Sequence, residues 1–478
     1  MTIKKEFEKI SAEVKRQLTL LSKGTAEVIP GIEQKPHLPS APRKDETLGD
    51  KIATSLIQGK PLRAYLGVDP TAPDIHLGHT VVLRKLKHFQ DLGHTAIFLI
   101  GDFSAMIGDP TGQSETRPPL TREQVDANAQ TYLAQVFKLL DPKKTEVRYN
   151  SEWLEKLSSY DVVRLCGHYR LARMLEREDF RARLRDNQPI SVHELLYPLL
   201  TAYDAVELHS DVEIGATEQK LNLLVHRDIQ REYGLAPEVA LTMPILVGLD
   251  GSRKMSKSLG NYVGITESPR DIFGKIMSIP DDLMWSYYEL LTDLSPDEVL
   301  ALKKRVESGE LHPRDAKVKL ATQIVDDFHT PSADHDDLKT DVSANRTAGS
   351  SLSTTIGTNT AAEFDRVFRD RQPPEVMQEF RIVRATENTM FVFELQGNIT
   401  TSTIHREISA VELRKWGKIL VALEQVASAS EAERIIKQGG FEVDGTLIRD
   451  PSAGIDWGKP HAYTVRLGKK KFLRIVVE

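Results

Sequence analysis

Two short apolar runs with an amphipathic helix between them constrain the fold of this chain more than any other feature. Residues 62–68 (LRAYLGV) and 95–100 (TAIFLI) are apolar and bounded by turns, as buried strands are. Residues 76–92 between them have helical periodicity that ends at Gly93. Strand–helix–strand units with right-handed crossovers imply a parallel sheet with helices on both faces. Ligands of such α/β sheets bind beyond the C-terminal ends of the strands.

The rest of the chain divides by pattern. An N-terminal helix that ends at Gly24 is predicted, and residues 29–43 have the composition of a linker. Thr121 and Gln124 fit a capping box that opens a helix to about Leu140. After about residue 268 the pattern is helical and charged. Residues 329–362 are rich in Ser, Thr, Asn and Ala, so we expect a mobile loop or linker there.

Composition excludes some classes of protein. At 478 residues the chain is longer than one core usually serves, so two or three domains are expected. Its net charge of −6 argues against a surface that binds nucleic acid everywhere. Cys166 is the single cysteine, which suits a reducing cytoplasm, and no zinc-site spacing is present. No apolar stretch is long enough for a membrane span, so we expect a cytoplasmic protein without a membrane partner.

The first motif with chemical meaning is DPTAPDIHLGH, residues 69–79, directly after the first strand. A helix start there offers free N–H groups and partial positive charge to a phosphate. Gly78 allows close approach to the backbone, and His76 and His79 share one face of the first turn. Together they can stabilise charge on an α-phosphate. Taken alone, the motif fits two simpler roles equally well: the histidines cap the helix, or they bind a metal ion.

The second motif is GLDGSRKMSKSLGN, residues 248–261, in which Lys254 and Lys257 lie on a loop flanked by Gly251 and Gly260. Two lysines three residues apart on such a loop can close over pyrophosphate. A lone basic pentapeptide is usually a solvated turn. This motif follows the histidine motif by about 175 residues, around an α/β sheet. The two motifs together are a strong signal for an enzyme that activates a small carboxylic acid with ATP.

At these residues the chain resembles the class I aminoacyl-tRNA synthetases, whose two signature motifs match HLGH and KMSKS. The stretches YLGVDPTAPDIHLGH, GDFSAMIGDPTG, ELLYPLLTAYDAVEL and LGNYVGI are similar to bacterial tyrosyl-tRNA synthetases. The resemblance implies an α/β fold: a Rossmann-like doubly wound parallel sheet catalytic domain, then a helical domain and a small α+β RNA-binding domain. It also implies a tyrosine–tRNA ligase that uses ATP and Mg²⁺, acts on L-tyrosine and tRNA, and is a homodimer.

The expected domains are residues 1–45 (N-terminal helix and linker), 46–270 (catalytic), 271–390 (helical, with the flexible 329–362 stretch) and 415–478 (RNA-binding, of the ribosomal-protein type). We expect Mg²⁺ to be held mainly by phosphate oxygens, so no metal site built from protein ligands is predicted.

The resemblance also implies roles for individual residues. Tyr65 and Asp204 would bind the phenol hydroxyl of the substrate, and Asp109 and Tyr197 its ammonium group. The residues expected to serve catalysis and ATP are His76, His79, Lys254 and Lys257, with a nucleotide pocket formed by Gly67, Asp69, Thr71, Gly78, Gly215 and Glu218. Thr201 and Gln219 complete the expected substrate contacts. The alternative for the two tyrosines is a place in the core.

Four positions depart from the family pattern. Thr201 replaces a glutamine of many members, near the substrate's ammonium group. The family's GGSDQ or GGTDQ segment is Gly215-Ala216-Thr217-Glu218-Gln219 here, so Ala216 and Glu218 both reduce the room beside the nucleotide. A basic residue common in the mobile loop is Gln113 here, although Arg117 follows. These changes leave open the alternative that the protein is a paralogue, which activates another amino acid or a tyrosine analogue.

The C-terminal part predicts an RNA partner. From Arg414 to Glu478 there are 12 Lys and Arg against 8 Asp and Glu, a net charge of +4. The rest of the chain therefore has a net charge of −10. Residues 418–448 have a helix, turn, helix and strand pattern similar to a ribosomal-protein-type RNA-binding domain. The cations expected to contact tRNA phosphates are Arg434, Lys437, Lys469, Lys470, Lys471 and Arg474. The arginine-rich run from Arg164 to Arg185 is interleaved with acids and fits an ion-paired helix near a dimer interface.

The resulting hypothesis is a tyrosine–tRNA ligase that forms tyrosyl-adenylate and transfers the acyl group to the 3′ end of tRNA. A second hypothesis is an RNA-binding or regulatory protein with an inactive synthetase fold, but retention of two distant phosphate-binding motifs argues against it. Both motifs would have to meet at one triphosphate for the first hypothesis to hold.

Overall fold

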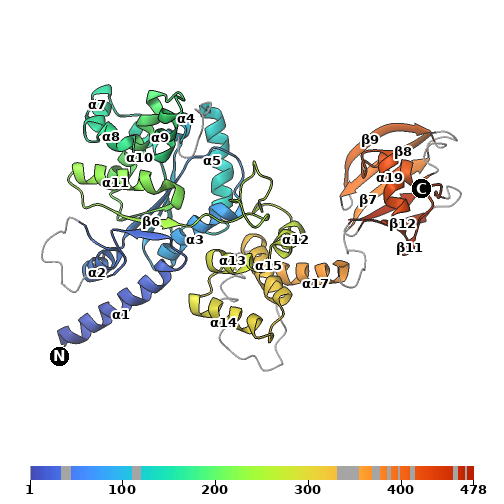
Figure 1. Cartoon of the computed structure of the whole chain (residues 1–478), viewed down its shortest axis with the longest axis horizontal. Coiled ribbons are helices and arrows are strands. Elements are labelled where there is room, and N and C mark those ends of the chain that lie inside the picture. The colour runs from blue at the N-terminus through green and yellow to red at the C-terminus, as the bar shows by residue number, and fades with distance from the viewer. Residues whose placement is uncertain are drawn as a thin grey trace. The chain divides into compact units, whose positions relative to one another are not determined.

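The computed structural model describes residues 2–33, 45–109, 120–330, 355–368, 377–384, 389–396, 399–409, 415–455, 461–468 and 471–477. The chain forms two compact units, Met1–Gly357 and Thr358–Glu478 (Figure 1). No helix in these ranges is both long and apolar enough to cross a bilayer.

A six-stranded sheet is the centre of the first unit. Its strands are β1 (Glu27–Ile29), β2 (Arg63–Val68), β3 (Thr95–Ile100), β4 (Thr145–Tyr149), β5 (Val212–Ala216) and β6 (Val239–Met243), in the order β1-β6-β5-β2-β3-β4. All neighbours pair in parallel except the edge strand β1, which is antiparallel to β6. The predicted doubly wound α/β sheet is therefore confirmed. The two strands predicted from the sequence, β2 and β3, lie within one residue of their expected bounds.

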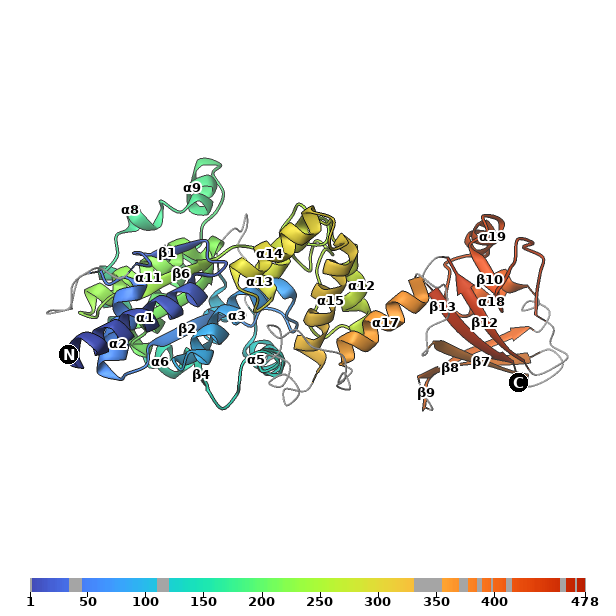
Figure 2. The ribbon, with the colours of Figure 1, turned by 90° about the horizontal axis from the view of Figure 1, so that it is seen from below.

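Helices of the first unit lie on and around this sheet. The elements are α1 (Thr2–Ser22), α2 (Leu48–Gln58), α3 (Leu77–Asp91), α4 (Ser104–Ile107), α5 (Arg122–Val136), α6 (Ser151–Leu154), α7 (Ser159–Gly167), α8 (Leu171–Met174), α9 (Glu178–Arg185), α10 (Val192–Leu208), a 3₁₀ turn (Thr217–Gln219) and α11 (Lys220–Glu232). Helix α3 packs on β2, β3 and β5 and also contacts α1 (Figure 2). Tyr65, Ile97 and Leu99 of the sheet pack instead with apolar residues of α10 and α11. Alternate residues of a strand thus face two helical layers.

Local signals in the sequence set the helix starts. His76 is the N-cap of α3, and Thr121 caps α5 through a capping box in which Thr121 N–H donates to Gln124 Oε1 at 3.0 Å. Helix α5 ends at Val136 rather than at the expected Leu140. Helix α1 ends at Ser22, two residues before Gly24, whose φ of 63° is left-handed.

A helical region follows the sheet. It comprises α12 (Pro269–Ser278), α13 (Leu283–Leu291), α14 (Pro296–Glu307), α15 (Pro313–His329) and α17 (Ile356–Phe368). Asp326 of α15 accepts hydrogen bonds from the Thr355 hydroxyl at 2.8 Å and from Gly357 N–H at 2.7 Å, so it holds the start of α17. The expected mobile stretch therefore ends in a helix from residue 356, whereas residues 331–354 lie outside the described ranges.

The second unit is built on a seven-stranded sheet. Its strands are β7 (Gln378–Arg384), β8 (Thr389–Gln396), β9 (Ile399–Ser409), β10 (Phe441–Val443), β11 (Thr446–Leu447), β12 (His461–Leu467) and β13 (Lys471–Val477), in the order β11-β10-β12-β13-β7-β8-β9. Helices α18 (Trp416–Ala422) and α19 (Ala429–Lys437) pack on it through a shared apolar core. The predicted helix–turn–helix–strand pattern is present. The sheet also includes residues 378–409, which the sequence-based boundaries left outside the C-terminal domain.

Candidate active site

A cavity of about 330 Å³ lies at the C-terminal ends of the parallel strands, where the topology predicts a ligand. Most of the residues selected from the sequence line it: Tyr65, Gly67, Asp69, Thr71, His79, Asp109, Tyr197, Thr201, Asp204, Gly215, Glu218, Gln219 and Lys254. His76, Gly78 and Lys257 belong to the adjoining helix start and loop and are not among the lining residues. The structure thus brings one scattered set of residues together around one space.

The two histidines of the first motif form a stacked pair at the start of α3. Their ring centroids are 3.9 Å apart. His76 Nδ1 accepts from Gly78 N–H, and His79 Nδ1 accepts from His76 N–H, each at 3.2 Å. Burial lowers the pKa of His76 to about 4 and that of His79 to about 3. Since both rings are neutral and use Nδ1 as an acceptor, each carries its hydrogen on Nε2, where it is available as a donor.

Two glycines leave room for side chains of the site, one beside His76 and the other beside Asp69. A Cβ atom on Gly78 would lie 2.9 Å from His76 Cε1, so the capping position of the His76 ring requires glycine. A Cβ atom on Gly101 would lie 2.1 Å from Asp69 Oδ1 and 2.4 Å from Ser104 Oγ. Gly101 therefore allows Asp69 to reach its partners at the end of β2.

The lysine loop lies directly against the histidine motif. Lys257 Nζ donates to the backbone oxygen of Asp74 at 2.7 Å, and Leu77 N–H donates to Val263 O at 2.9 Å. Lys254 Nζ forms an ion pair with Glu218 Oε1 at 2.9 Å. The loop thus touches both the start of α3 and the 3₁₀ turn that follows β5. The two motifs, far apart in sequence, lie within reach of one ligand.

Buried polar groups form the floor of the cavity. Asp204 is 3% exposed and accepts hydrogen bonds from Trp153 Nε1 at 2.7 Å and Asn150 Nδ2 at 3.2 Å. Burial raises the pKa of Asp204 well above its usual range, and it does the same for Tyr65. A polar pair in such a dry position favours a ligand with a matching polar group.

Acidic and hydroxyl groups line the side of the cavity. Asp69 accepts from Ser104 Oγ at 2.6 Å and from the Tyr197 hydroxyl at 2.9 Å. Asp109 accepts from Gln219 Nε2 at 2.9 Å. Asp69 and Asp109 therefore both face the cavity, which suits a ligand with a positive charge.

The sequence analysis missed several buried residues of the cavity wall. Glu213 and His226 both line the cavity, and His226 Nε2 lies 3.1 Å from the Thr201 hydroxyl. His226 Nδ1 lies 2.8 Å from Glu213 Oε2. An acid inside the buried strand VEIGA was the available signal, because an unpaired charge is costly there. Asn222 and Tyr132 also line the cavity and were not predicted.

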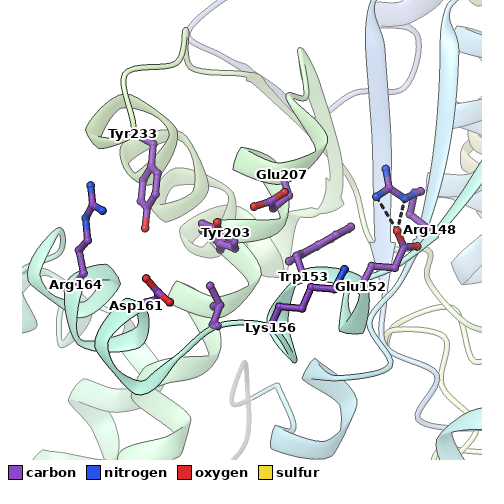
Figure 3. Close-up of a pocket in the computed structure, with 10 residues that line it drawn as sticks. Arg148, Glu152, Trp153, Lys156, Asp161, Arg164, Tyr203, Glu207 and Tyr233 are labelled. Atoms are coloured by element: carbon purple, nitrogen blue, oxygen red, sulfur yellow. Dashed lines mark hydrogen bonds and ion pairs between the residues drawn. The ribbon is translucent and has the colours of Figure 1, made fainter.

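A second cavity, of about 450 Å³, is shown in Figure 3. Figure 3 shows the Arg148–Glu152 ion pair at one end and Arg164 with Tyr233 at the other. Trp153 lines this cavity while its indole N–H donates to Asp204 of the first. The two spaces therefore share a supporting side chain.

The predicted RNA-binding cations lie in the second unit. Arg434, Lys437, Lys471 and Arg474 are all exposed. Lys437 is 3.6 Å from Glu433, and Arg474 is 3.7 Å from Glu379. Lys469 and Lys470 lie outside the described ranges, as do Gln113 and Arg117 of the first unit.

Comparison with known proteins identifies the family. The family model for class I tRNA synthetases (W and Y) matches residues 58–338. The chain belongs to this family. The tyrosine–tRNA ligase of Oleidesulfovibrio alaskensis is 48% identical over 432 residues, covering 90% of this chain and 95% of that protein. That of Moorella thermoacetica is 45% identical, covering 98% and 97%.

Solved structures agree on the fold of this synthetase. A C-terminally truncated Aspergillus nidulans mitochondrial tyrosyl-tRNA synthetase superimposes with a TM-score of 0.55 at 19% identity, covering 77% of this chain and 99% of that one. The Archaeoglobus fulgidus tyrosyl-tRNA synthetase crystallised with L-tyrosine gives 0.51 at 23% identity, covering 66% and 98%. The predicted family and the predicted fold are both confirmed.

Proposed function

We infer that this synthetase is a tyrosine–tRNA ligase. The tyrosine carboxylate attacks the α-phosphate of ATP, the bond to pyrophosphate breaks, and the acyl group then passes from the adenylate to a 3′-terminal ribose hydroxyl of tRNA. One observation carries this inference: a single cavity is lined by the buried Tyr65 and Asp204 and also by His79 and Lys254 of the two phosphate-binding motifs. The relatives at 45–48% identity, which carry the same activity in their names, support it.

The residue roles follow the geometry. Tyr65 and Asp204 at the floor suit the phenol hydroxyl, and Asp109 and Tyr197 suit the ammonium group. The Nε2 hydrogens of His76 and His79 are donors for the α-phosphate, while Lys254 and Lys257 are cations for pyrophosphate. ATP enters as its magnesium complex. Catalysis then consists of positioning and charge stabilisation and needs no protein base.

A homodimer in the cytoplasm is the proposed working state. Large apolar side chains are exposed on the segment from α7 to the start of α10: Tyr160, Val163, Leu171, Leu184 and Val192. Exposed large apolar side chains concentrated on one segment are typical of a protein interface. Exposed cations of the second unit are the proposed contacts to tRNA phosphates.

Tyrosine-dependent exchange between pyrophosphate and ATP, run across all amino acids, tests the inference. Exchange with tyrosine far above that with any other amino acid is the expected result. Exchange driven best by another amino acid would identify a paralogue, and ATP binding without exchange would identify an inactive synthetase fold.

A further inference from the structure

A buried imidazole and two buried carboxylates meet beside the main cavity. Glu213 lies on β5, His226 on α11, and Glu238 directly before β6. Their exposed fractions are 5%, 5% and 0%. One nitrogen or oxygen atom of each side chain lies within 4.8 Å of those of the other two. Three successive elements of the sheet layer thus direct metal-ligand atoms toward one point in the interior.

The surroundings of His226 leave one ring nitrogen for coordination. Thr201 Oγ1 lies 3.0 Å from Tyr197 O and 3.1 Å from His226 Nε2. Because a carbonyl oxygen only accepts, the Thr201 hydroxyl spends its hydrogen on Tyr197 O and offers a lone pair to the imidazole. His226 therefore carries its hydrogen on Nε2, the pattern usual for a metal-bound histidine. Its Nδ1 faces the two oxygens of Glu213 at 2.8 and 3.0 Å.

Glu238 supplies an oxygen that no protein group satisfies. Its Oε2 accepts a hydrogen bond from the Ser210 hydroxyl, whereas its Oε1 is buried without a hydrogen-bond partner in the described part of the chain. The backbone at this residue is fixed, since Glu238 N–H donates to Gln230 Oε1 at 2.6 Å. Carboxylates in the interior are costly unless they are paired or coordinate a metal ion. The unsatisfied oxygen therefore points to a cation.

We propose that Glu213, His226 and Glu238 bind a structural divalent metal ion, and that this ion is Zn²⁺. Two carboxylates balance its charge, and imidazole nitrogen with carboxylate oxygen is an ordinary zinc ligand set, whereas Mg²⁺ takes oxygen ligands. Glu213 and His226 line the cavity, which gives the ion a path of entry and a water as fourth ligand. The ion is separate from the magnesium of ATP and joins β5, α11 and the start of β6.

The metal content of the untagged enzyme, purified without chelator, tests the proposal. Elemental mass spectrometry should find about one zinc ion per chain. Glu238→Gln keeps the shape of the side chain but removes one charged ligand, so zinc content should fall about tenfold or more. Glu232→Gln is the matched control, because Glu232 is an exposed acid 3.7 Å from another histidine, His168. This control should keep its zinc.

A second measurement uses the unmodified chain, so that a folding defect in a variant has no bearing on it. The enzyme is stripped with a chelator and dialysed, and one ion is then added back. Zinc at about 100 times its Kd should raise Tm by about 3 °C or more. Co²⁺ should give the visible absorption bands of a four-coordinate site. Mg²⁺ at the same concentration should produce neither effect.

Two results would overturn the proposal. If the purified enzyme holds no zinc and the stripped enzyme responds to neither Zn²⁺ nor Co²⁺, a proton rather than a metal ion joins His226 to Glu213. If Glu238→Gln keeps a full complement of zinc, the ion lies elsewhere in the chain. Neither measurement uses tyrosine activation, so failure of the proposed function would leave both unchanged.

Discussion

Lys254 Nζ lies 2.9 Å from Glu218 Oε1, so one lysine of the signature loop is paired with an acid in the 3₁₀ turn that follows β5. Glu218 occupies the position at which the family pattern has aspartate. The longer side chain thus places its carboxylate against the loop.

A double-mutant cycle measures what this pair contributes to stability. The two side chains are 56% and 45% exposed, and exposed ion pairs contribute little because water screens them. Lys254→Met combined with Glu218→Gln should give a coupling below about 1 kcal/mol in the free energy of unfolding. A coupling of about 2 kcal/mol or more in urea unfolding would show that the loop is held more firmly than its exposure implies.

Replacing Lys257 should affect chemistry rather than binding. Lys257→Ala removes a cation from the loop next to the histidine pair, and loss of such a group typically slows the chemical step about 10²-fold or more. Tyrosine affinity should stay near normal, since Lys257 does not line the cavity that holds the proposed amino-acid site. Pyrophosphate exchange and equilibrium tyrosine binding measure the two effects, with the exposed Lys60→Ala as a control. Equal losses in both would mean that Lys257 is structural.

Gly101 is expected to tolerate no side chain. Gly101→Ala forces a methyl group against the Asp69 carboxylate and Ser104, so the free energy of unfolding should fall by about 2 kcal/mol or more. Gly274 in α12 is the matched control, because its added Cβ meets nothing within 4 Å. Gly274→Ala should stabilise the chain by about 0.5–1 kcal/mol. Equal effects in urea denaturation would contradict the packing described around Asp69.

The neutral histidine pair predicts how stability depends on pH. An unfolded histidine titrates near pH 6.5, whereas burial lowers the pKa of His79 to about 3. The unfolded chain therefore takes up protons that the folded chain does not, and stability falls as the pH drops from about 6.5 toward 4. His79→Gln should make this fall shallower. An unchanged slope, with the exposed His193→Gln as reference, would mean that His79 is charged in the fold.

Replacing cations of the second unit should affect tRNA binding and leave tyrosine activation unchanged. Arg434→Ala with Lys437→Ala should weaken tRNA binding and reduce the slope of log K against log salt by about 0.7–0.9 for each phosphate that the variant no longer neutralises. Tyrosine activation should not change. Glu433→Gln on the same helix controls for a change in α19. Normal tRNA affinity with an unchanged salt slope would remove both residues from the interface.

Local signals predicted much of the fold and of the site. The capping positions of His76 and Thr121, the two strands and the approach of Lys257 to the histidine motif all depend on short-range chemistry or on two distinctive motifs. Glu213 and His226 were missed because their importance depends on the packing of α11 against β5. The strands β7–β9 were missed because β7 pairs with β13, about 90 residues later in the chain.

The position of β13 between β12 and β7 has a consequence for biosynthesis. The meander of β7, β8 and β9 leaves the ribosome well before the strand that covers the open side of β7. Until β13 arrives, that side presents unpaired backbone groups to any neighbouring nascent chain. Slow translation between residues 409 and 471 would therefore prolong the period in which this synthetase is most prone to aggregate.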